Sequence, residues 1–334
     1  MSDILLKIRD LNVSIKRGKR DIPILKGVNI DIPRGRITGL VGESGSGKSM
    51  SAKSVMGLLP SNAHVSGSKL WNDQDGTETE LTGLNEKQLR CMCGPRMGMI
   101  FQEPMTSLNP TMRIGDQVAE VLLIHKLVKD RKEAEKKVIR LLDEVGISDP
   151  EHRYRSYPHE LSGGMRQRVM IAMAMISDPE LLIADEPTTA LDVTTQAQIL
   201  KLISQMCKSR EMSALVITHN MGVVSSLCEY VYVMYMGRIM ERAGTERLFK
   251  APLHPYTRGL LSSIPGIGSN PEYLTTIPGN IPEFGKETVG CEFCLRCSDD
   301  ERRCFFERPS ETEVLEGHFV SCFNAAKKEQ TGNE

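Results

Sequence analysis

Apolar and polar residues alternate along the start of the chain, from residue 4 to residue 32. Turn-forming residues interrupt this alternation around Gly18 and again at Pro33 and Gly35. A period of two residues places successive side chains on opposite faces of a strand, and such breaks are typical of turns between strands. The pattern therefore predicts an antiparallel β subdomain at the start of the chain.

In the rest of the first 250 residues, short apolar runs alternate with amphipathic segments. Residues 37–41, 181–184 and 214–218 are apolar runs typical of buried strands. Helices are expected at residues 50–59 and 194–207, and residues 130–145 carry apolar side chains at helical spacing before Gly146. The charges between those apolar positions indicate a solvent-exposed helix face. This order predicts an α/β fold with a mainly parallel sheet and an inserted helical subdomain over about residues 106–175.

Beyond residue 249 the chain becomes rich in proline, which marks the end of the alternating pattern. The prolines are Pro252, Pro255, Pro265, Pro271, Pro278 and Pro282. We therefore expect a main domain over residues 1–251, a small Pro- and Cys-rich C-terminal domain over residues 252–326 and a disordered tail over residues 327–334.

The bulk composition describes an ordinary globular protein and excludes several classes of function. Charged residues make up 25% of the 334 residues and the formal net charge is -1, so no bulk positive charge attracts nucleic acid. The start of the chain carries Asp3 and lacks the apolar core of a secretory signal, and no apolar run approaches the roughly 20 residues that cross a bilayer. We expect a cytoplasmic protein that reaches the membrane only through partner subunits.

A glycine-rich segment separates the strand expected at residues 37–41 from the helix that follows it. It fits the P-loop pattern with Gly42, Glu43, Ser44, Gly45, Ser46, Gly47, Lys48 and Ser49. Glycines allow backbone N–H groups to turn inward around phosphate oxygens, and the helix N-terminus adds a favourable dipole. We expect Lys48 to neutralise the β- and γ-phosphates and Ser49 to bind magnesium. All of these residues except Glu43 are candidate nucleotide ligands.

Two carboxylates end the apolar strand expected at residues 181–184. Asp185 and Glu186 would lie at the carboxyl edge of a parallel sheet, where ligands of open α/β folds bind. Asp185 is a candidate to hold magnesium through water, and Glu186 is a candidate to orient or deprotonate an attacking water. An apolar strand followed by an acidic turn is common, so this segment gains its meaning from the P-loop.

The segment Leu161-Ser162-Gly163-Gly164-Met165 resembles the signature of the ABC ATPases, Leu-Ser-Gly-Gly-Gln, at the start of a helix. The resemblance implies an ABC ATPase fold and a dimer in which Ser162, Gly163 and Gly164 contact the γ-phosphate held by the opposite subunit. Met165 stands where the family most often has glutamine, so no contact from that side chain is carried over.

Three further positions follow in the order expected of this family. Gln102 matches its mobile glutamine, which touches magnesium and the attacking water from a loop that faces the membrane partner. His219 matches the histidine that contacts the γ-phosphate, and Asp192 matches a loop that crosses the dimer interface. The resemblance thus implies catalytic roles for Lys48, Gln102, Glu186 and His219.

One expected element of the nucleotide site is absent from the sequence. ABC ATPases commonly stack adenine on an aromatic residue of the N-terminal strands, whereas residues 4–32 contain no aromatic residue. Ile15 or Ile24 would contact the base instead, without the roughly 1 to 3 kcal/mol that stacking contributes.

Four segments narrow the resemblance to the ATPases of dipeptide and oligopeptide importers. They are residues 106–110, 254–258 and 277–282 and the cysteine-rich tail. The resemblance implies uptake of peptides, with nickel chelates or oligosaccharides as alternative cargo. It also implies a second ATPase subunit, generally a paralogue, two permease subunits and, indirectly, an extracytoplasmic solute-binding protein, with the chain at the cytoplasmic face of the cell membrane.

Five of the nine cysteines lie near the end of the chain, at Cys291, Cys294, Cys297, Cys304 and Cys322. Thiols at this spacing in a reducing compartment suggest metal binding rather than disulfides. Tails of this kind in the peptide importers can hold a [4Fe–4S] cluster, and the matching ligands are Cys291, Cys297, Cys304 and Cys322. Cys294 adds a spacing that also resembles a ferredoxin ligand set, so which four of the five bind stays open. Zinc and free thiols are alternatives, since a zinc site would use the same residues.

Two other classes of protein share some of these motifs. Soluble ABC ATPases that act in DNA repair or on ribosomes usually carry a long coiled-coil insertion or a second ATPase set, and the sequence contains neither. A P-loop kinase would not need Leu161 to Gly164 or His219. The function that the sequence favours is therefore that of an ATP-hydrolysing subunit of an ABC importer.

Overall fold

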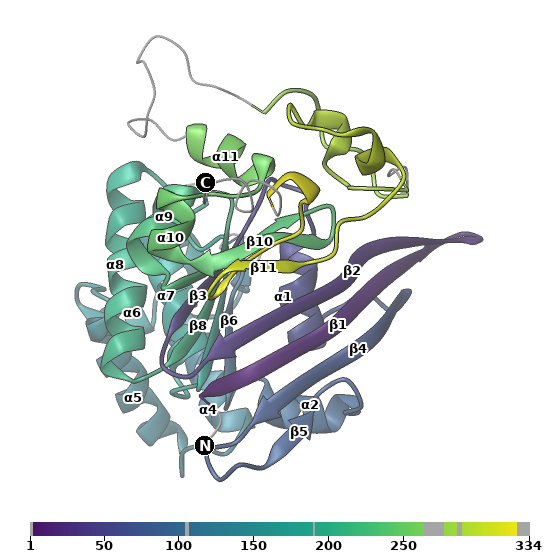
Figure 1. Cartoon of the computed structure of the whole chain (residues 1–334). Coiled ribbons are helices and arrows are strands. Elements are labelled where there is room, and N and C mark those ends of the chain that lie inside the picture. Colours follow the sequence, from purple (N-terminus) through teal and green to yellow (C-terminus); the bar gives the residue numbers. More distant parts are fainter. Residues whose placement is uncertain (1–2, 104–106, 190, 264–276, 286–288, 326–334) are drawn as a thin grey trace. The chain divides into compact units, whose positions relative to one another are not determined.

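The computed structural model describes residues 3–103, 107–189, 191–263, 277–285 and 289–325 of the chain (Figure 1). The chain divides into two compact units. Unit 1 comprises Met1–Pro33, Ile37–Thr82 and Thr218–Glu334, and unit 2 comprises Arg34–Arg36 and Gly83–Ile217.

The strands of unit 1 are β1 (Ile4–Arg17), β2 (Arg20–Pro33), β3 (Ile37–Val41), β4 (Ala63–Asn72), β5 (Glu78–Glu80), β9 (Tyr230–Tyr235), β10 (Arg238–Gly244), β11 (Thr312–Leu315) and β12 (His318–Val320). Its helices are α1 (Lys48–Met56), α9 (Met221–Leu227), α10 (Thr245–Lys250) and α11 (Pro255–Ser262), with 3-10 turns at Cys294–Arg296 and Arg302–Phe305.

The strands of unit 2 are β6 (Met97–Ile100), β7 (Leu181–Asp185) and β8 (Ser213–Thr218), the last residue of which falls in unit 1. Its helices are α2 (Glu86–Met92), α4 (Ile114–Ile124), α5 (Arg131–Glu144), α6 (Pro150–Tyr154), α7 (Gly163–Met175) and α8 (Val193–Ser209), with a 3-10 turn at Pro158–Glu160.

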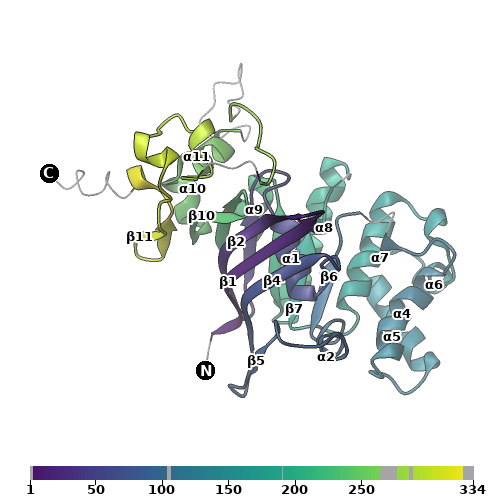
Figure 2. The same cartoon turned by 90° about the vertical axis from the view of Figure 1, so that its right-hand side faces the viewer.

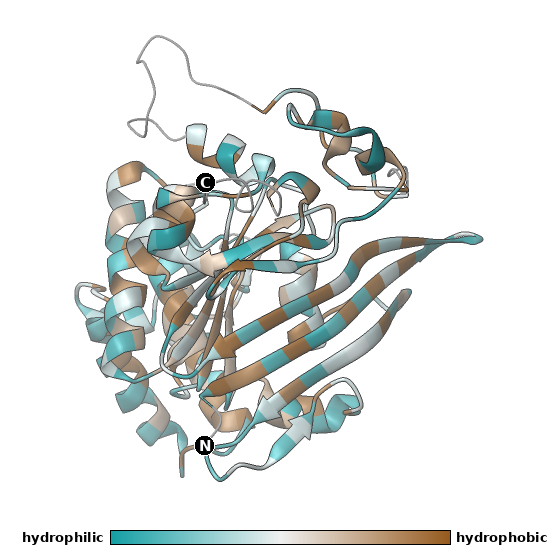
Figure 3. Cartoon of the chain, in the orientation of Figure 1, coloured by the Kyte–Doolittle hydropathy of each residue, from teal (hydrophilic) through white to brown (hydrophobic). Residues whose placement is uncertain are grey.

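A long antiparallel hairpin of β1 and β2 opens unit 1, and β4 pairs with the other side of β1 (Figure 1). With β5 the strand order is β2-β1-β4-β5. Apolar and polar residues alternate along both long strands (Figure 3), and the apolar side chains of Leu6, Ile8, Leu25 and Ile30 are buried. The antiparallel β subdomain that the alternation predicts is confirmed.

A second set of strands in unit 1 carries the P-loop, in the order β11-β12-β10-β9-β3. Strands β3 and β9 pair in parallel, whereas the pairs β9–β10, β10–β12 and β12–β11 are antiparallel. Strand β12 lies between Cys304 and Cys322 and pairs with β10, where Glu241 lies opposite Val320. The sequence predicted a mainly parallel sheet and did not anticipate these antiparallel strands.

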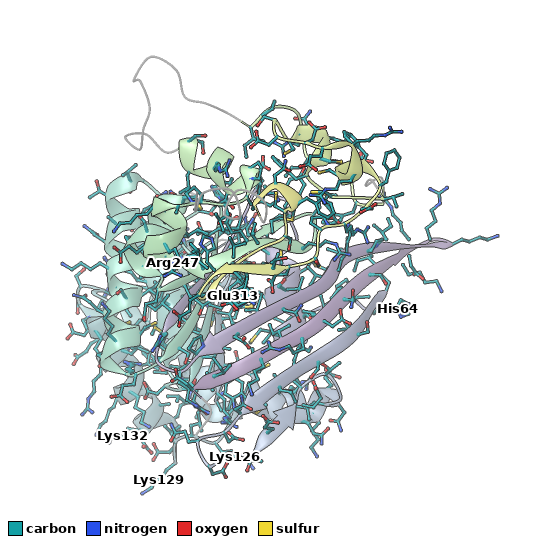
Figure 4. The ribbon with its side chains drawn as sticks, in the orientation of Figure 1. His64, Lys126, Lys129, Lys132, Arg247 and Glu313 are labelled. Atoms are coloured by element: carbon teal, nitrogen blue, oxygen red, sulfur yellow. The ribbon has the colours of Figure 1, made fainter. Side chains whose placement is uncertain are left out.

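The strands of unit 2 follow the prediction, since β6, β7 and β8 are all parallel. Helices α4, α5, α6 and α7 lie together as a group (Figure 2). Helix α5 begins after Asp130, whose side chain accepts a hydrogen bond from the Glu133 N–H at 2.8 Å. Lys132 of this helix is exposed, as are Lys126 and Lys129 just before it (Figure 4), and the exposure of Lys132 agrees with the solvated face predicted for residues 130–145. Within the ranges that the structure describes, none of the helices combines the length and apolar character needed to cross a bilayer.

His254 caps the start of α11 from a buried position. Its Nδ1 accepts a hydrogen bond from the Tyr256 N–H at 3.0 Å, and its backbone N–H donates to Glu241 Oε2 at 2.9 Å. Burial lowers the pKa of His254 to about 4, from an ordinary value of 6.5. The imidazole is therefore neutral in the folded chain, which is the form that can accept the helix-capping bond.

We predict that this histidine makes the folded chain less stable as the pH falls from 6.5 to about 4. In that window the unfolded imidazole binds a proton and the buried one does not, which corresponds to about 3 kcal/mol. A His254→Asn variant keeps an acceptor for the helix start but does not titrate. Its free energy of unfolding, measured by denaturant titration at each pH, should fall by about 3 kcal/mol less than that of the wild type. Equal losses in the two proteins would contradict the prediction.

Candidate nucleotide site

The P-loop joins β3 to α1 in unit 1. All five residues of β3 are buried, and α1 begins at Lys48, two residues before the predicted start, with Gly47 as its N-cap. Gly42 and Gly47 have φ angles of 155° and 108°, which L side chains rarely adopt. A Cβ on Gly42 would lie 2.1 Å from the carbonyl oxygen of Met234, so only glycine fits there.

Lys48 holds the P-loop from the inside. The residue is 4% exposed, and its Nζ donates to the carbonyl oxygens of Gly42 and Glu43, both at 2.8 Å. From outside the loop, the Gly237 N–H donates to the carbonyl oxygen of Ser46 at 2.8 Å. These bonds satisfy the carbonyl oxygens of Gly42, Glu43 and Ser46. They hold the loop in a conformation that can present its backbone N–H groups to an anion.

Glu186 follows β7 and adopts a left-handed backbone conformation, with a φ of 46°. Its N–H donates to the carbonyl oxygen of Ile217 at 2.8 Å. Its Oε2 accepts hydrogen bonds from Gln102 Nε2 at 3.1 Å and from Thr189 Oγ1 at 2.9 Å. The preceding Asp185 is 3% exposed. A strained backbone that aims a hydrogen-bonded carboxylate from a strand end is typical of a functional site.

The signature segment lies at the start of α7. Ser162 is exposed and caps the helix, because its Oγ accepts a hydrogen bond from the Met165 N–H at 3.3 Å. Gly163 is also exposed, and no atom of the described residues lies within 4 Å of the place where its Cβ would be. Asp192 caps α8 by accepting hydrogen bonds from the Thr195 hydroxyl and N–H at 2.7 and 2.9 Å, and these bonds lower its pKa. Ser162 and Gly163 thus present an accessible helix N-terminus.

The candidate residues divide between the two units. Unit 1 contains the P-loop and His219, an exposed residue directly after β8. Unit 2 contains the signature segment together with Gln102, Asp185 and Glu186, and brings Gln102 into contact with Glu186.

Sequence reasoning missed three residues that contact this machinery. The Thr189 hydroxyl donates a hydrogen bond to Glu186. The only sequence signal for this contact is that Thr189 follows Glu186 by three residues. Tyr256 and Arg296 contact Glu43 of the P-loop, from 213 and 253 residues further along the chain. No local pattern in the sequence could have paired residues at such separations.

The cysteine-rich segment of unit 1, which runs from Cys291 to Cys322, brings its thiols near one another. Electrostatic interactions link Cys304 with Cys291 and Cys322, and Cys322 with Cys297. The sulfurs accept backbone N–H bonds as follows: Cys291 from Phe293, Cys297 from Asp299, Cys304 from Glu301, and Cys322 from Asn324 and Ala325. Burial raises the pKa of Cys291 to about 12 and that of Cys297 to about 11. Among the described residues, no three His, Cys, Asp or Glu side chains are arranged to share a single metal ion.

Two family models match the chain, one in its first two thirds and one in its C-terminal part. Residues 25–189 match the family model described as ABC transporter, and residues 240–304 match the oligopeptide/dipeptide transporter C-terminal region. The chain is 46% identical to the oligopeptide transport ATP-binding protein AppD of Bacillus subtilis (strain 168), over 96% of each chain. It is 42% identical to OppD of Escherichia coli (strain K12), over 98% of this chain and 95% of the relative.

Solved structures resemble the chain as well. A dimeric, post-hydrolysis structure of the ATP-binding cassette MJ0796 bound to ADP and Pi has a TM-score of 0.63 and 25% sequence identity. The similarity covers 72% of this chain and 98% of that one. The cbiO1 protein from Clostridium perfringens, part of the ABC transporter complex cbiONQ, has a TM-score of 0.62 and 29% identity, over 75% of this chain and 92% of that one.

We predict that Gly42→Ala weakens ATP binding, because the added Cβ meets the Met234 carbonyl and distorts the P-loop. Strain of about 1 to 3 kcal/mol corresponds to a Kd raised roughly 5- to 140-fold, measured by titration with a fluorescent ATP analogue. Gly18→Ala is the control, since Gly18 also has a positive φ, of 64°, but no described atom within 4 Å of its Cβ position. Equal ATP affinity in the two variants would refute the role of Gly42.

Proposed function

The chain belongs to the ATP-binding subunits of oligopeptide and dipeptide ABC transporters, and we propose that it hydrolyses ATP with Glu186 as the residue that activates water. It has the ABC ATPase fold, and its ATP hydrolysis energises peptide uptake through membrane subunits. The observation that carries the assignment of Glu186 is its carboxylate, held by Gln102 and Thr189 at the end of β7.

ATP would bind with its phosphates in the P-loop. The N–H groups of Gly42 to Ser49 and the start of α1 attract the phosphate oxygens, and Lys48 neutralises the β- and γ-phosphates. In the proposal, the ligands are Gly42, Ser44, Gly45, Ser46, Gly47, Lys48 and Ser49. Ile15 or Ile24 contacts the adenine in place of an aromatic residue.

In the proposal, three oxygen donors would hold a magnesium ion that accompanies the ATP. They are the hydroxyl of Ser49, the side-chain oxygen of Gln102 and the carboxylate of Asp185, which are the ligand types that this hard cation prefers. Because Gln102 uses its Nε2 to contact Glu186, its amide oxygen can face the cation. Bound magnesium would supply positive charge that offsets the negative charge of the phosphates.

In the hydrolytic step, the Glu186 carboxylate accepts a proton as the oxygen of a water molecule attacks the γ-phosphorus. The bond from that phosphorus to the bridging oxygen breaks, so that ADP leaves and inorganic phosphate forms. Gln102 orients the water, and Lys48 and His219 stabilise the charge on the γ-phosphate oxygens. Thr189 holds Glu186 in position through its hydroxyl.

Two such ATPase subunits would enclose two ATP molecules. Ser162, Gly163 and Gly164 of each subunit contact the γ-phosphate on the other, since an exposed helix N-terminus attracts an anion. The exposure of Ser162 and Gly163 supports this role. Hydrolysis then lets the pair separate, and this cycle drives the membrane subunits.

The proposed partners follow from the family. They are a paralogous ATPase subunit, two permease subunits and, indirectly, an extracytoplasmic solute-binding protein, with the chain peripheral at the cytoplasmic face of the membrane. Di- or oligopeptides are the proposed cargo, and nickel chelates or oligosaccharides are the alternatives. Copurification of permease subunits would support the importer, whereas copurification of DNA or ribosomes would support a soluble ABC ATPase.

The C-terminal part forms the second component of the proposal. A main domain over residues 1–251, with a helical subdomain at about 106–175, precedes a Pro- and Cys-rich domain over residues 252–326. The disordered tail predicted at residues 327–334 lies outside the described residues.

We propose that Cys291, Cys297, Cys304 and Cys322 hold a [4Fe–4S] cluster, with Cys294 as a possible substitute. Backbone N–H bonds to all four sulfurs support this choice, because such bonds stabilise thiolate ligands and tune a cluster. Zinc, which would use the same cysteines, and free thiols are the alternatives. A cluster would supply a rigid link between the thiols and a capacity to accept an electron.

We predict that Glu186→Gln slows ATP hydrolysis by at least about 100-fold while ATP still binds, because the proton acceptor is lost but the P-loop is intact. Gel filtration with ATP and magnesium should then show the closed ATPase dimer. Glu211→Gln is the matched control, since Glu211 has a similar φ of 51° and is exposed. Rapid turnover in Glu186→Gln would overturn the assignment.

Anaerobic purification with iron, sulfide and zinc analysis tests the cluster. We predict iron and sulfide in the wild type, their loss in Cys291→Ser and Cys322→Ser, and their retention in Cys294→Ser. Cys91→Ser is the control, since Cys91 is an exposed thiol of unit 2. Zinc without sulfide, or no metal in any sample, would contradict the cluster.

A further inference from the structure

The P-loop carries a carboxylate that nucleotide binding does not use. Both oxygens of Glu43 engage Arg296, with Nη1 donating to Oε2 at 2.8 Å and Nη2 donating to Oε1 at 3.0 Å. The Arg296 side chain is 5% exposed and the Glu43 side chain is 28% exposed. A two-bond arginine–carboxylate pair fixes both the distance and the plane of the carboxylate, so this contact positions Glu43 closely.

Arg296 is itself held by its surroundings. Its Nε donates to the carbonyl oxygen of Pro278 at 2.8 Å, and its guanidinium lies 5.8 Å from the ring centroid of Tyr235. Tyr235 packs against Tyr256 and Phe293, with ring centroids 4.8 and 5.3 Å away. The arginine is therefore a fixed support and not a mobile surface cation.

Tyr256 provides a second contact with the same residue. Its phenol oxygen accepts a hydrogen bond from the Glu43 N–H at 2.8 Å. Both the backbone and the side chain of Glu43 are thus held by residues of the C-terminal part of the chain.

The cysteine-rich segment also supports the other end of the P-loop. Glu292, whose side chain is 3% exposed, accepts a hydrogen bond from Arg238 Nε at 2.7 Å. The neighbouring Gly237 donates its N–H to the carbonyl oxygen of Ser46. One short segment therefore forms two ion pairs beside the P-loop. Arg296 pairs with Glu43 at the start of the loop, and Glu292 pairs with Arg238, next to the residue that holds Ser46.

The charge of Glu43 makes the Arg296 contact necessary for anion binding. The carbonyl oxygen of Glu43 already accepts a hydrogen bond from Lys48 Nζ at 2.8 Å, so its carboxylate lies one side chain away from the phosphate-binding cation. Without Arg296, this carboxylate would compete with phosphate for Lys48 and would repel a nucleotide. Pairing with Arg296 removes both effects.

We infer that Arg296 is a positioning residue for the P-loop, which holds Glu43 away from Lys48 and so makes ATP binding depend on the cysteine-rich segment. The inference rests on the proposed binding of ATP by the P-loop. Its consequence is that damage to the cysteine-rich segment weakens ATP binding in the same subunit, although none of its residues touches the nucleotide.

The test compares the Kd for ATP and magnesium in the full chain and in two glutamine variants. Arg296→Gln should raise the Kd at least tenfold. Arg242→Gln is the matched control, because Arg242 forms an equivalent pair with Glu311, at 2.9 Å for both bonds, and this pair does not touch the P-loop. The control should change the Kd less than twofold, even where both variants lower the Tm equally. Kd values that agree within twofold in the two variants would overturn the inference.

A second variant separates positioning from general stability. In the Arg296→Gln background, Glu43→Gln removes the competing carboxylate. The double variant should therefore bind ATP with a Kd within about threefold of the wild-type value. Failure of this rescue would overturn the competition with Lys48. If Arg296→Gln does not fold, Arg296→Lys replaces it in the test. Lysine keeps the positive charge but cannot form the two parallel hydrogen bonds to Glu43, so the Kd for ATP should rise at least threefold. An unchanged Kd would overturn the inference.

Wild type and Lys48→Ala distinguish this inference from the proposed function. A wild type that does not bind ATP would overturn both. A wild type that binds ATP, together with a Lys48→Ala variant that does not and an Arg296→Gln variant that binds normally, would overturn only the role of Arg296.

Discussion

The phosphate binding that we propose for the backbone N–H groups of the P-loop is the constraint on which our account of this structure depends. A loop that points its N–H groups at an anion cannot pair its own carbonyl groups in a regular helix or strand, so other residues must satisfy them. Here Lys48 satisfies Gly42 and Glu43, and Gly237 satisfies Ser46. Strand β3 and helix α1 continue from the two ends of the loop, and the turn after β9 holds the loop at Ser46.

Local features of this design could be predicted from the sequence because their physical causes are local. The apolar run at residues 37–41 is strand β3 at the same residues, and the helix expected at residues 130–145 differs from α5 by one residue at each end. The P-loop could also be predicted, because the positive φ angles that it needs are provided by glycines within a span of eight residues. Strand β10 was not visible, since Arg238, Glu241 and Arg242 interrupt its apolar residues and it pairs with β12 from far along the chain.

The contacts that hold the candidate site were harder to predict than the residues proposed to carry its chemistry. Gln102 and Glu186 were expected near the same water molecule, and their side chains are in contact. Tyr256 and Arg296 lie in segments that resemble the peptide-importer ATPases, but no sequence pattern indicated their contact with Glu43, which follows only from packing. The C-terminal region over residues 252–326, expected from its prolines to be a separate domain, contributes both the arginine beside the P-loop and strand β12. Its support of the loop depends on tertiary structure, which local patterns do not record.

The most direct test of the central claim is uptake of a radiolabelled peptide into vesicles that contain this chain, its partner ATPase and the permease subunits, together with the solute-binding protein. The account predicts accumulation with ATP and none with a non-hydrolysable analogue. Peptide accumulation without hydrolysis, or hydrolysis-driven uptake of a nickel chelate or an oligosaccharide but of no peptide, would contradict it.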